Sequence, residues 1–162
     1  MVKRNTNVLL TIIFAVSSLL IISFAGNNRT YQTECVTLEI DGYVTLKIWD
    51  TKKSARYKPE QARKDAVNAI LFSGIGGGNG CSTQPPILNK AGDQEKFLSI
   101  EKIFFARKGT WSIFTRNSAT ETTLAASLGI KNWKVYQVSV STNELRKYLE
   151  ENKIIKPITD GF

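Results

Sequence analysis

The sequence has no histidine, two cysteines (Cys35 and Cys81) and one methionine among 162 residues. Without histidine, Ser-His-Asp and Cys-His catalytic arrangements and imidazole-based metal sites are excluded. Two cysteines alone make an incomplete zinc set, so no metal ion is expected. We find no catalytic motif in the sequence, and we predict a protein that has neither catalytic residues nor a cofactor.

The composition is that of one folded, basic domain. Lys and Arg number 22 against 14 Asp and Glu, a formal charge of +8, with 42% hydrophobic and 22% charged residues. Such a chain lies well away from the weakly hydrophobic, highly charged composition of disordered proteins. A basic protein attracts anionic partners. Outside the cytoplasm, where residues 1–25 direct the chain if they act as an export signal, those partners are anionic lipid, glycan and acidic protein surfaces, so no nucleic-acid partner is expected.

The N-terminus predicts export. Lys3 and Arg4 precede an uncharged run over residues 8–25 that ends in Ser23-Phe24-Ala25. This pattern is typical of a signal peptide over residues 1–25, cleaved after Ala25. The run has 18 residues, near the lower limit of about 17 for a spanning helix, so an uncleaved N-terminal membrane anchor is the alternative. Both place a single domain, residues 26–162, outside the cytoplasm in the periplasm or cell envelope.

The two cysteines allow one intramolecular pairing. In an oxidising compartment a Cys35–Cys81 disulfide would stabilise the fold by about 4 kcal/mol. The alternative is a pair of small buried thiols that never meet. No cysteine directly follows the apolar run, which disfavours a lipid anchor.

The first half of the domain predicts a hairpin and a helix. Residues 34–50 alternate in hydropathy around Asp41-Gly42, and a three-residue turn with Gly42 in the left-handed region gathers the aliphatic side chains on one face. Those side chains are Val36, Leu38, Val44, Leu46 and Ile48. Pro59 opens a helix with a small-residue stripe (Ala62, Ala66, Ala69, Ile70, Ser73) that ends at Gly74.

Residues 74–89 form a Gly-rich loop that follows the end of this helix. Phosphate-binding glycine loops instead lead into a helix N-terminus, so we expect a surface loop tethered through Cys81.

The second half predicts two helices and two strands. A helix over residues 93–108, with Asp93 as N-cap, would bury Phe97, Leu98, Ile100, Ile103 and Phe104. Residues 110–116 and 133–140 are expected to pair as antiparallel strands. Ser141 and Glu144 form a capping box that opens a final helix. The predicted class is therefore α+β: an antiparallel sheet of about four strands (two hairpins) with about three helices packed on one face.

One cluster of charge stands out, over residues 52–64. It consists of Lys52, Lys53, Arg56, Lys58, Arg63 and Lys64. One interpretation is an anion-contacting edge for lipid phosphate or glycan. The other is a solvated loop followed by a helical turn.

Several segments together resemble small exported proteins of Bacteroidota to which no activity is assigned. They are the Ala62-to-Ile75 helix end, Gln84-Pro85-Pro86-Ile87-Leu88, Phe104-Phe105, Lys134-to-Val140 leading into Leu145 and Leu149, and Gly161-Phe162. The Ala-striped helix and the strand leading into a capped helix are also loosely similar to domains of flagellar-assembly and surface-lipoprotein families. The resemblance implies an envelope setting and brings no catalytic residue.

The sequence thus predicts an exported, non-catalytic binding or assembly module of the cell envelope, with an envelope protein as partner. The alternative is a binder of anionic lipid or glycan through residues 52–64.

Overall fold

The computed structural model describes residues 30–52, 56–116, 119–120 and 134–157. The predicted signal segment, residues 1–25, and residues 158–162 therefore lie outside the described residues. The elements are β1 (Tyr31–Leu38), β2 (Tyr43–Asp50), α2 (Pro59–Phe72), α3 (Ala91–Phe104), the 3-10 helix η1 (Thr110–Phe114), β3 (Ala119–Thr120), β4 (Val135–Ser141) and α5 (Thr142–Glu151).

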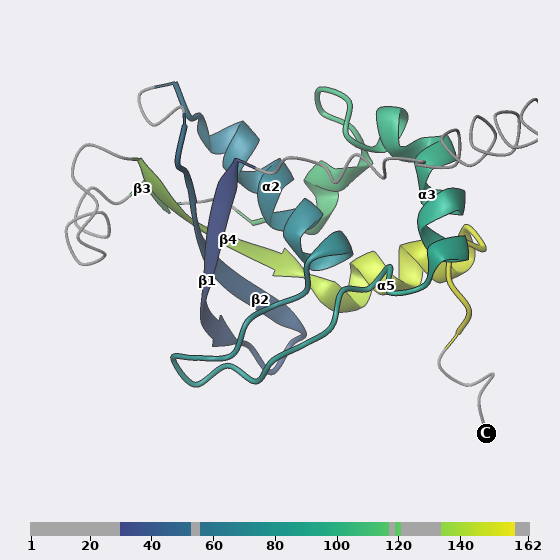
Figure 1. The fold of residues 1–162 in the computed structure, drawn as a ribbon, viewed down its shortest axis with the longest axis horizontal. Coiled ribbons are helices and arrows are strands. Elements are labelled where there is room, and N and C mark those ends of the chain that lie inside the picture. Colours follow the sequence, from purple (N-terminus) through teal and green to yellow (C-terminus); the bar gives the residue numbers. More distant parts are fainter. Residues whose placement is uncertain (1–29, 53–55, 117–118, 121–133, 158–162) are drawn as a thin grey trace, which may run out of the picture.

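The predicted α+β class with an antiparallel sheet is confirmed. The strand order is β1-β2-β4-β3, and every neighbouring pair is antiparallel. Four full strands are not confirmed, because β3 has two residues beside strands of seven or eight. The placement of all three helices on one face is not confirmed either. α2 packs against the sheet, whereas α3 lies away from it against η1 (Figure 1).

The β1–β2 turn has the predicted three-residue form. Glu39 N–H donates to the Tyr43 carbonyl at 2.7 Å, and Gly42 takes a φ of 80°. The prediction that Val36 and Leu38 share one face is wrong, because a bulge between Cys35 and Thr37 shifts the register of β1. The shift lets Cys35 and Leu38, three residues apart, both join the core side of the strand.

The main core lies between α2 and the sheet. Buried side chains of β2 (Val44, Leu46, Ile48) and β4 (Tyr136, Val138, Val140) meet the Ala62, Ala66, Val67 and Ile70 positions of the helix. Alanines at this contact allow the helix to approach the sheet closely, as the sequence predicted. Ser73, expected on the stripe, is exposed at the helix C-cap.

The predicted strand over residues 110–116 is wrong. Residues 110–114 form η1, whose three-residue period puts Trp111 and Phe114 on one buried face and leaves Ile113 73% exposed. The Trp111 indole N–H donates to the Ala106 carbonyl at 2.9 Å, which fixes the turn. Strand-like pairing begins only at Thr115, which forms an isolated bridge with Val140.

Helix α3 begins at Ala91 with Lys90 as N-cap, so the prediction of Asp93 as N-cap is wrong. Its buried residues are Phe97 and Phe104, whereas Leu98 and Ile103 are 59% and 74% exposed, against expectation. Neighbouring helix residues are about 100° apart, so a narrow contact cannot cover Ile103 together with Phe104. The Phe105 ring packs edge-to-face against the rings of Phe97 and Phe104, so Phe105 contributes to the domain's own core.

The predicted N-cap is confirmed: Ser141 is the N-cap of α5, and its hydroxyl accepts from Glu144 N–H at 3.4 Å, which is one of the two hydrogen bonds of a capping box. Leu145 and Leu149 are buried, as expected for this helix. Beyond it, Ile154 and Ile155 dock into the core.

Candidate binding pocket

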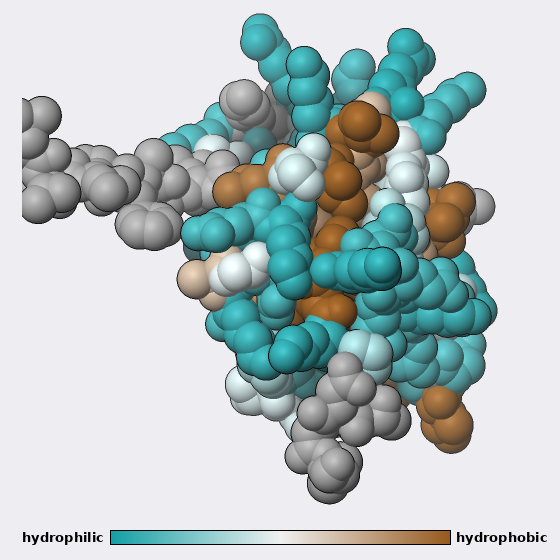
Figure 2. Space-filling model, turned by 90° about the vertical axis from the view of Figure 1, so that its right-hand side faces the viewer, coloured by the Kyte–Doolittle hydropathy of each residue, from teal (hydrophilic) through white to brown (hydrophobic). Residues whose placement is uncertain are grey.

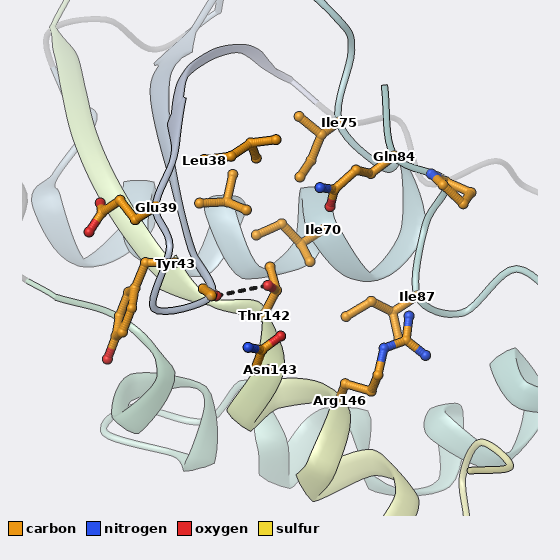
Figure 3. A pocket seen from close by; sticks show the side chains of 13 residues that line it. Leu38, Glu39, Tyr43, Ile70, Ile75, Gln84, Ile87, Thr142, Asn143 and Arg146 are labelled. Carbon is orange, nitrogen blue, oxygen red and sulfur yellow. Dashed lines mark hydrogen bonds between the residues drawn. The ribbon is translucent and has the colours of Figure 1, made fainter. Parts of the chain in front are cut away.

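A pocket of about 360 Å³ opens where the β1–β2 turn, the end of α2, the Gly-rich loop and the start of α5 meet (Figure 3). Its lining includes five branched aliphatic side chains: Leu38, Val44, Ile70, Ile75 and Ile87. Gln84, Asn143 and Arg146 add polar groups around them. Polar and apolar groups share the exposed lining about equally, so the pocket can hold a ligand that carries both kinds of group.

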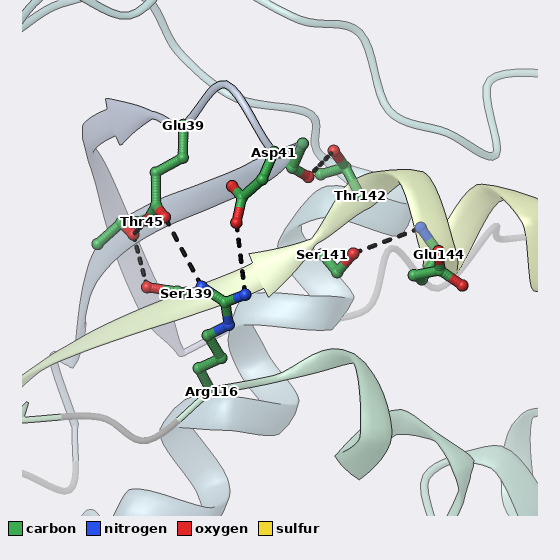
Figure 4. A network of polar contacts seen from close by, with 9 residues as sticks. Glu39, Asp41, Thr45, Arg116, Ser139, Ser141, Thr142 and Glu144 are labelled. Carbon is green, nitrogen blue, oxygen red and sulfur yellow. Dashed lines mark hydrogen bonds and ion pairs between the residues drawn. The ribbon is translucent and has the colours of Figure 1, made fainter.

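The two charged side chains of this lining, Glu39 and Arg146, differ in whether they have an ion-pair partner. Glu39 is held on the far side, where it accepts from the Thr45 hydroxyl at 2.8 Å and pairs with Arg116 at 4.0 Å (Figures 3 and 4). Among the described residues no carboxylate lies within ion-pair distance of Arg146, which is half-buried. Arg146 and Ile87 both belong to the lining of the pocket (Figure 3).

The Gly-rich loop supplies one wall and is fastened to the edge strand β1. Cys35 and Cys81 form a disulfide, so the two residues that the sequence left either paired or separate are joined. The Asn79 amide N–H donates to the Glu34 carboxylate and to the Cys35 carbonyl. Within the loop, Ile75 and Gln84 exchange two backbone hydrogen bonds of 2.8 and 3.0 Å. The wall is therefore built before any ligand arrives.

Gly74 sets the direction in which this loop leaves α2. It has a φ of 75°, and a Cβ there would overlap the Gln84 carbonyl and the Pro85–Pro86 backbone. Glycine alone meets both requirements without strain.

The opposite wall is held by contacts around the hairpin turn (Figure 4). Arg116 pairs with Asp41 at 3.4 Å and stacks on the Tyr43 ring at 3.5 Å. Thr142 donates from its backbone and side chain to the Gly42 carbonyl, at 3.0 and 2.9 Å, which ties the turn to the start of α5.

The structure divides the basic cluster of residues 52–64. Arg63 donates to the Thr115 hydroxyl at 2.8 Å and to the Ser112 carbonyl at 3.1 Å, so it secures η1 to α2. Lys64 lies over the Trp111 ring and pairs with Glu60 at 3.8 Å. The side chains of Lys52, Arg56 and Lys58 are exposed, and Lys53 lies outside the described residues.

A second pocket, of about 470 Å³, lies beside Arg56, Lys58 and Lys64. It also contains three carboxylates, Asp50, Glu60 and Asp65, so the formal charges of its lining balance. Such a lining offers an anion no net attraction.

Asp65 is the buried carboxyl of this second pocket. The Tyr57 hydroxyl donates to it at 2.7 Å and the Gln61 amide at 2.8 Å. Burial raises the pKa of Asp65 above its ordinary 3.8, although both hydrogen bonds act in the other direction. Burial, followed by the charge of Asp65, also raises the pKa of Tyr57 far above its usual range. The pair anchors residue 57 to α2.

Among the residues that the structure describes, no group of three Cys, Asp or Glu side chains is placed to hold a metal ion. No helix in that part of the chain has the length and apolar character needed to cross a membrane.

The exposed apolar side chains of α3 do not make a second site. Leu98 and Ile103 are five residues apart and so point about 140° away from each other around the helix. On this side of the molecule apolar side chains form a narrow central strip between hydrophilic ones, and the other apolar groups lie apart from one another near the edges of the view (Figure 2).

No family model matches the chain, and neither the curated proteins nor the solved structures contain a significant match.

The pocket itself was not predicted from the sequence. Its lining comes from four separate segments, between Leu38 and Arg146, and no local motif connects them. The available signals were the excess of glycine in the loop and the two cysteines, which marked the loop as tethered without showing what it faces.

Proposed function

We propose that this protein is a non-catalytic binding or assembly module of the cell envelope, exported from the cytoplasm and working through the pocket between the β1–β2 turn, α2 and α5. The observation that carries the proposal is the disulfide between Cys35 and Cys81, which fixes the loop that forms one wall of this pocket. A loop cross-linked to the edge strand supplies Ile75, Gln84 and Ile87, and a pre-formed site avoids the entropic cost of ordering a loop on binding.

Export is supported by the basic and apolar N-terminal pattern of residues 1–25 and by the Cys35–Cys81 disulfide. Disulfides persist in oxidising compartments and are rare in the cytosol of most organisms. An envelope protein is the proposed partner.

The alternative, binding of anionic lipid or glycan through residues 52–64, has weaker support. Lys52, Arg56 and Lys58 are exposed and available to an anion. Arg63 and Lys64 are committed to η1 and Trp111, and the neighbouring pocket carries equal acidic charge.

The test is a crosslinking pull-down of tagged protein from a native envelope fraction, with the intact mass of the bait recorded. Gln84→Trp fills the pocket, and Ser82→Trp is the matched control because Ser82 is exposed on the same loop and does not line the pocket. Thermal melts show whether both variants are folded.

We expect a stoichiometric partner with wild type and with Ser82→Trp, and its loss with Gln84→Trp. A mass that lacks residues 1–25 would show that the signal segment has been removed. Equal capture by all three proteins would contradict the proposed site. Turnover of an ester or glycoside substrate would contradict the non-catalytic assignment.

A further inference from the structure

The lining of the pocket combines aliphatic side chains with one arginine that has no ion-pair partner among the described residues. Leu38, Ile70, Ile75 and Ile87 present methyl and methylene groups, and Arg146 brings a permanent positive charge to the edge. Glu39, an acid of the same lining, is turned away and paired with Arg116. The lining thus offers a ligand both aliphatic contacts and an unpaired positive charge.

Arginine is suited to one kind of ligand group in such a place. Its planar guanidinium donates two parallel hydrogen bonds to a carboxylate, and it loses less hydration energy than an ammonium group when covered. The half-buried position of Arg146 reduces the screening of its charge by water. The Gln84 and Asn143 amides on the same lining can bond the remaining polar atoms of a ligand.

We infer that the pocket binds a carboxylate attached to a short aliphatic group, with the carboxylate at Arg146 and the aliphatic part among Leu38, Ile70, Ile75 and Ile87. A volume of about 360 Å³ is near the lower end of ligand pockets, which suits a short chain. Two sources share this chemistry: a free aliphatic acid, and the C-terminal carboxylate of a peptide that ends in an aliphatic residue. The inference rests on the proposed binding function and names the ligand class for the same site.

The experiment compares each acid with its uncharged amide, using NMR and calorimetric titrations of the folded domain. Hexanoate and hexanamide represent the free acid. A short peptide ending in leucine, as free acid and as C-terminal amide, represents the peptide source. Arg146→Gln removes the charge, Arg146→Lys keeps a point charge, and Lys147→Gln is the matched control on an exposed neighbour that does not line the pocket.

Wild type and Lys147→Gln should prefer the acid over the amide by about 10- to 100-fold in at least one of the two series. Arg146→Gln should bind acid and amide alike, and Arg146→Lys should keep part of the preference. The series that shows the preference identifies the source.

Equal binding of acid and amide by wild type in both series would overturn the inference, and so would a preference for the acid that survives in Arg146→Gln. The absence of saturable binding both by hexanoate and by the peptide acid would also overturn it. The pull-down separates this failure from failure of the proposed function. Capture that depends on Gln84, without any preference for acids, removes the ligand class and leaves the binding module standing.

Discussion

Loss of the Cys35–Cys81 disulfide should destabilise the domain by about 4 kcal/mol. The two cysteines are 46 residues apart, and closing a loop of that length removes this much conformational entropy, expressed as free energy, from the unfolded chain. For a domain of this size, such a loss corresponds to a fall in Tm of roughly 10–15 °C. The perturbation is the double variant Cys35→Ala/Cys81→Ala, measured by equilibrium urea denaturation.

The structure also predicts which part of the domain loses local stability when the disulfide is removed. Without the cross-link, the Asn79 amide still bonds the loop to Glu34 and Cys35 of β1. Hydrogen exchange should accelerate at the amides of Ile75 and Gln84, which bond to each other, and change least where β2 pairs with β4.

Wild type measured with a reductant is the control, and it should match the double variant to within about 1 kcal/mol, since both lack the same cross-link. A cost below about 1 kcal/mol would refute the entropic argument. Unchanged exchange at Ile75 and Gln84 would refute the claim that the disulfide holds the pocket wall.

Four smaller perturbations test the remaining contacts. Arg63→Ala breaks the hydrogen bonds to η1 and should cost about 2–3 kcal/mol in urea denaturation, and a loss under about 0.5 kcal/mol would contradict that role. Ser141→Ala removes the N-cap and should lower stability by about 1 kcal/mol with an unchanged m-value. Gly42→Ala strains a residue with positive φ and pushes a Cβ into Asn143, so a Tm at or above that of wild type would count against the turn. Because burial raises the pKa of Asp65, its contribution to stability falls as the pH rises from 3.8 through the pKa of the folded state. Asp65→Asn should abolish this fall in urea midpoints measured across that pH range, and parallel pH curves of the midpoint for wild type and variant would show that another group is responsible.

Features fixed by neighbouring residues could be predicted from the sequence. The three-residue turn at Gly42 follows from hydropathy parity and the conformational freedom of glycine, and the cap at Ser141 follows from one hydroxyl and one amide three residues later. Both depend on contacts within a few residues.

The errors arise where distant residues decide. Residues 110–114 alternate like a strand, but Arg63, which lies 49 residues before Ser112, donates to the Ser112 carbonyl. Together with the local bond from the Trp111 indole to the Ala106 carbonyl, this contact favours a 3-10 turn. The basic cluster looked uniform in sequence, yet the structure commits Arg63 and Lys64 to internal contacts. The pocket and the isolation of Arg146 depend on how four segments meet, which no local pattern encodes.

The most direct test of the binding pocket is a methyl NMR spectrum of protein labelled at isoleucine and leucine, recorded during addition of hexanoate and, separately, of the peptide acid that ends in leucine. With at least one of the two ligands we predict saturable shifts at Leu38, Ile70, Ile75 and Ile87, and none at the exposed Leu98, Ile103 and Ile113, which serve as internal controls. Shifts confined to those three exposed side chains, or no shifts at any methyl group with either ligand, would contradict the account.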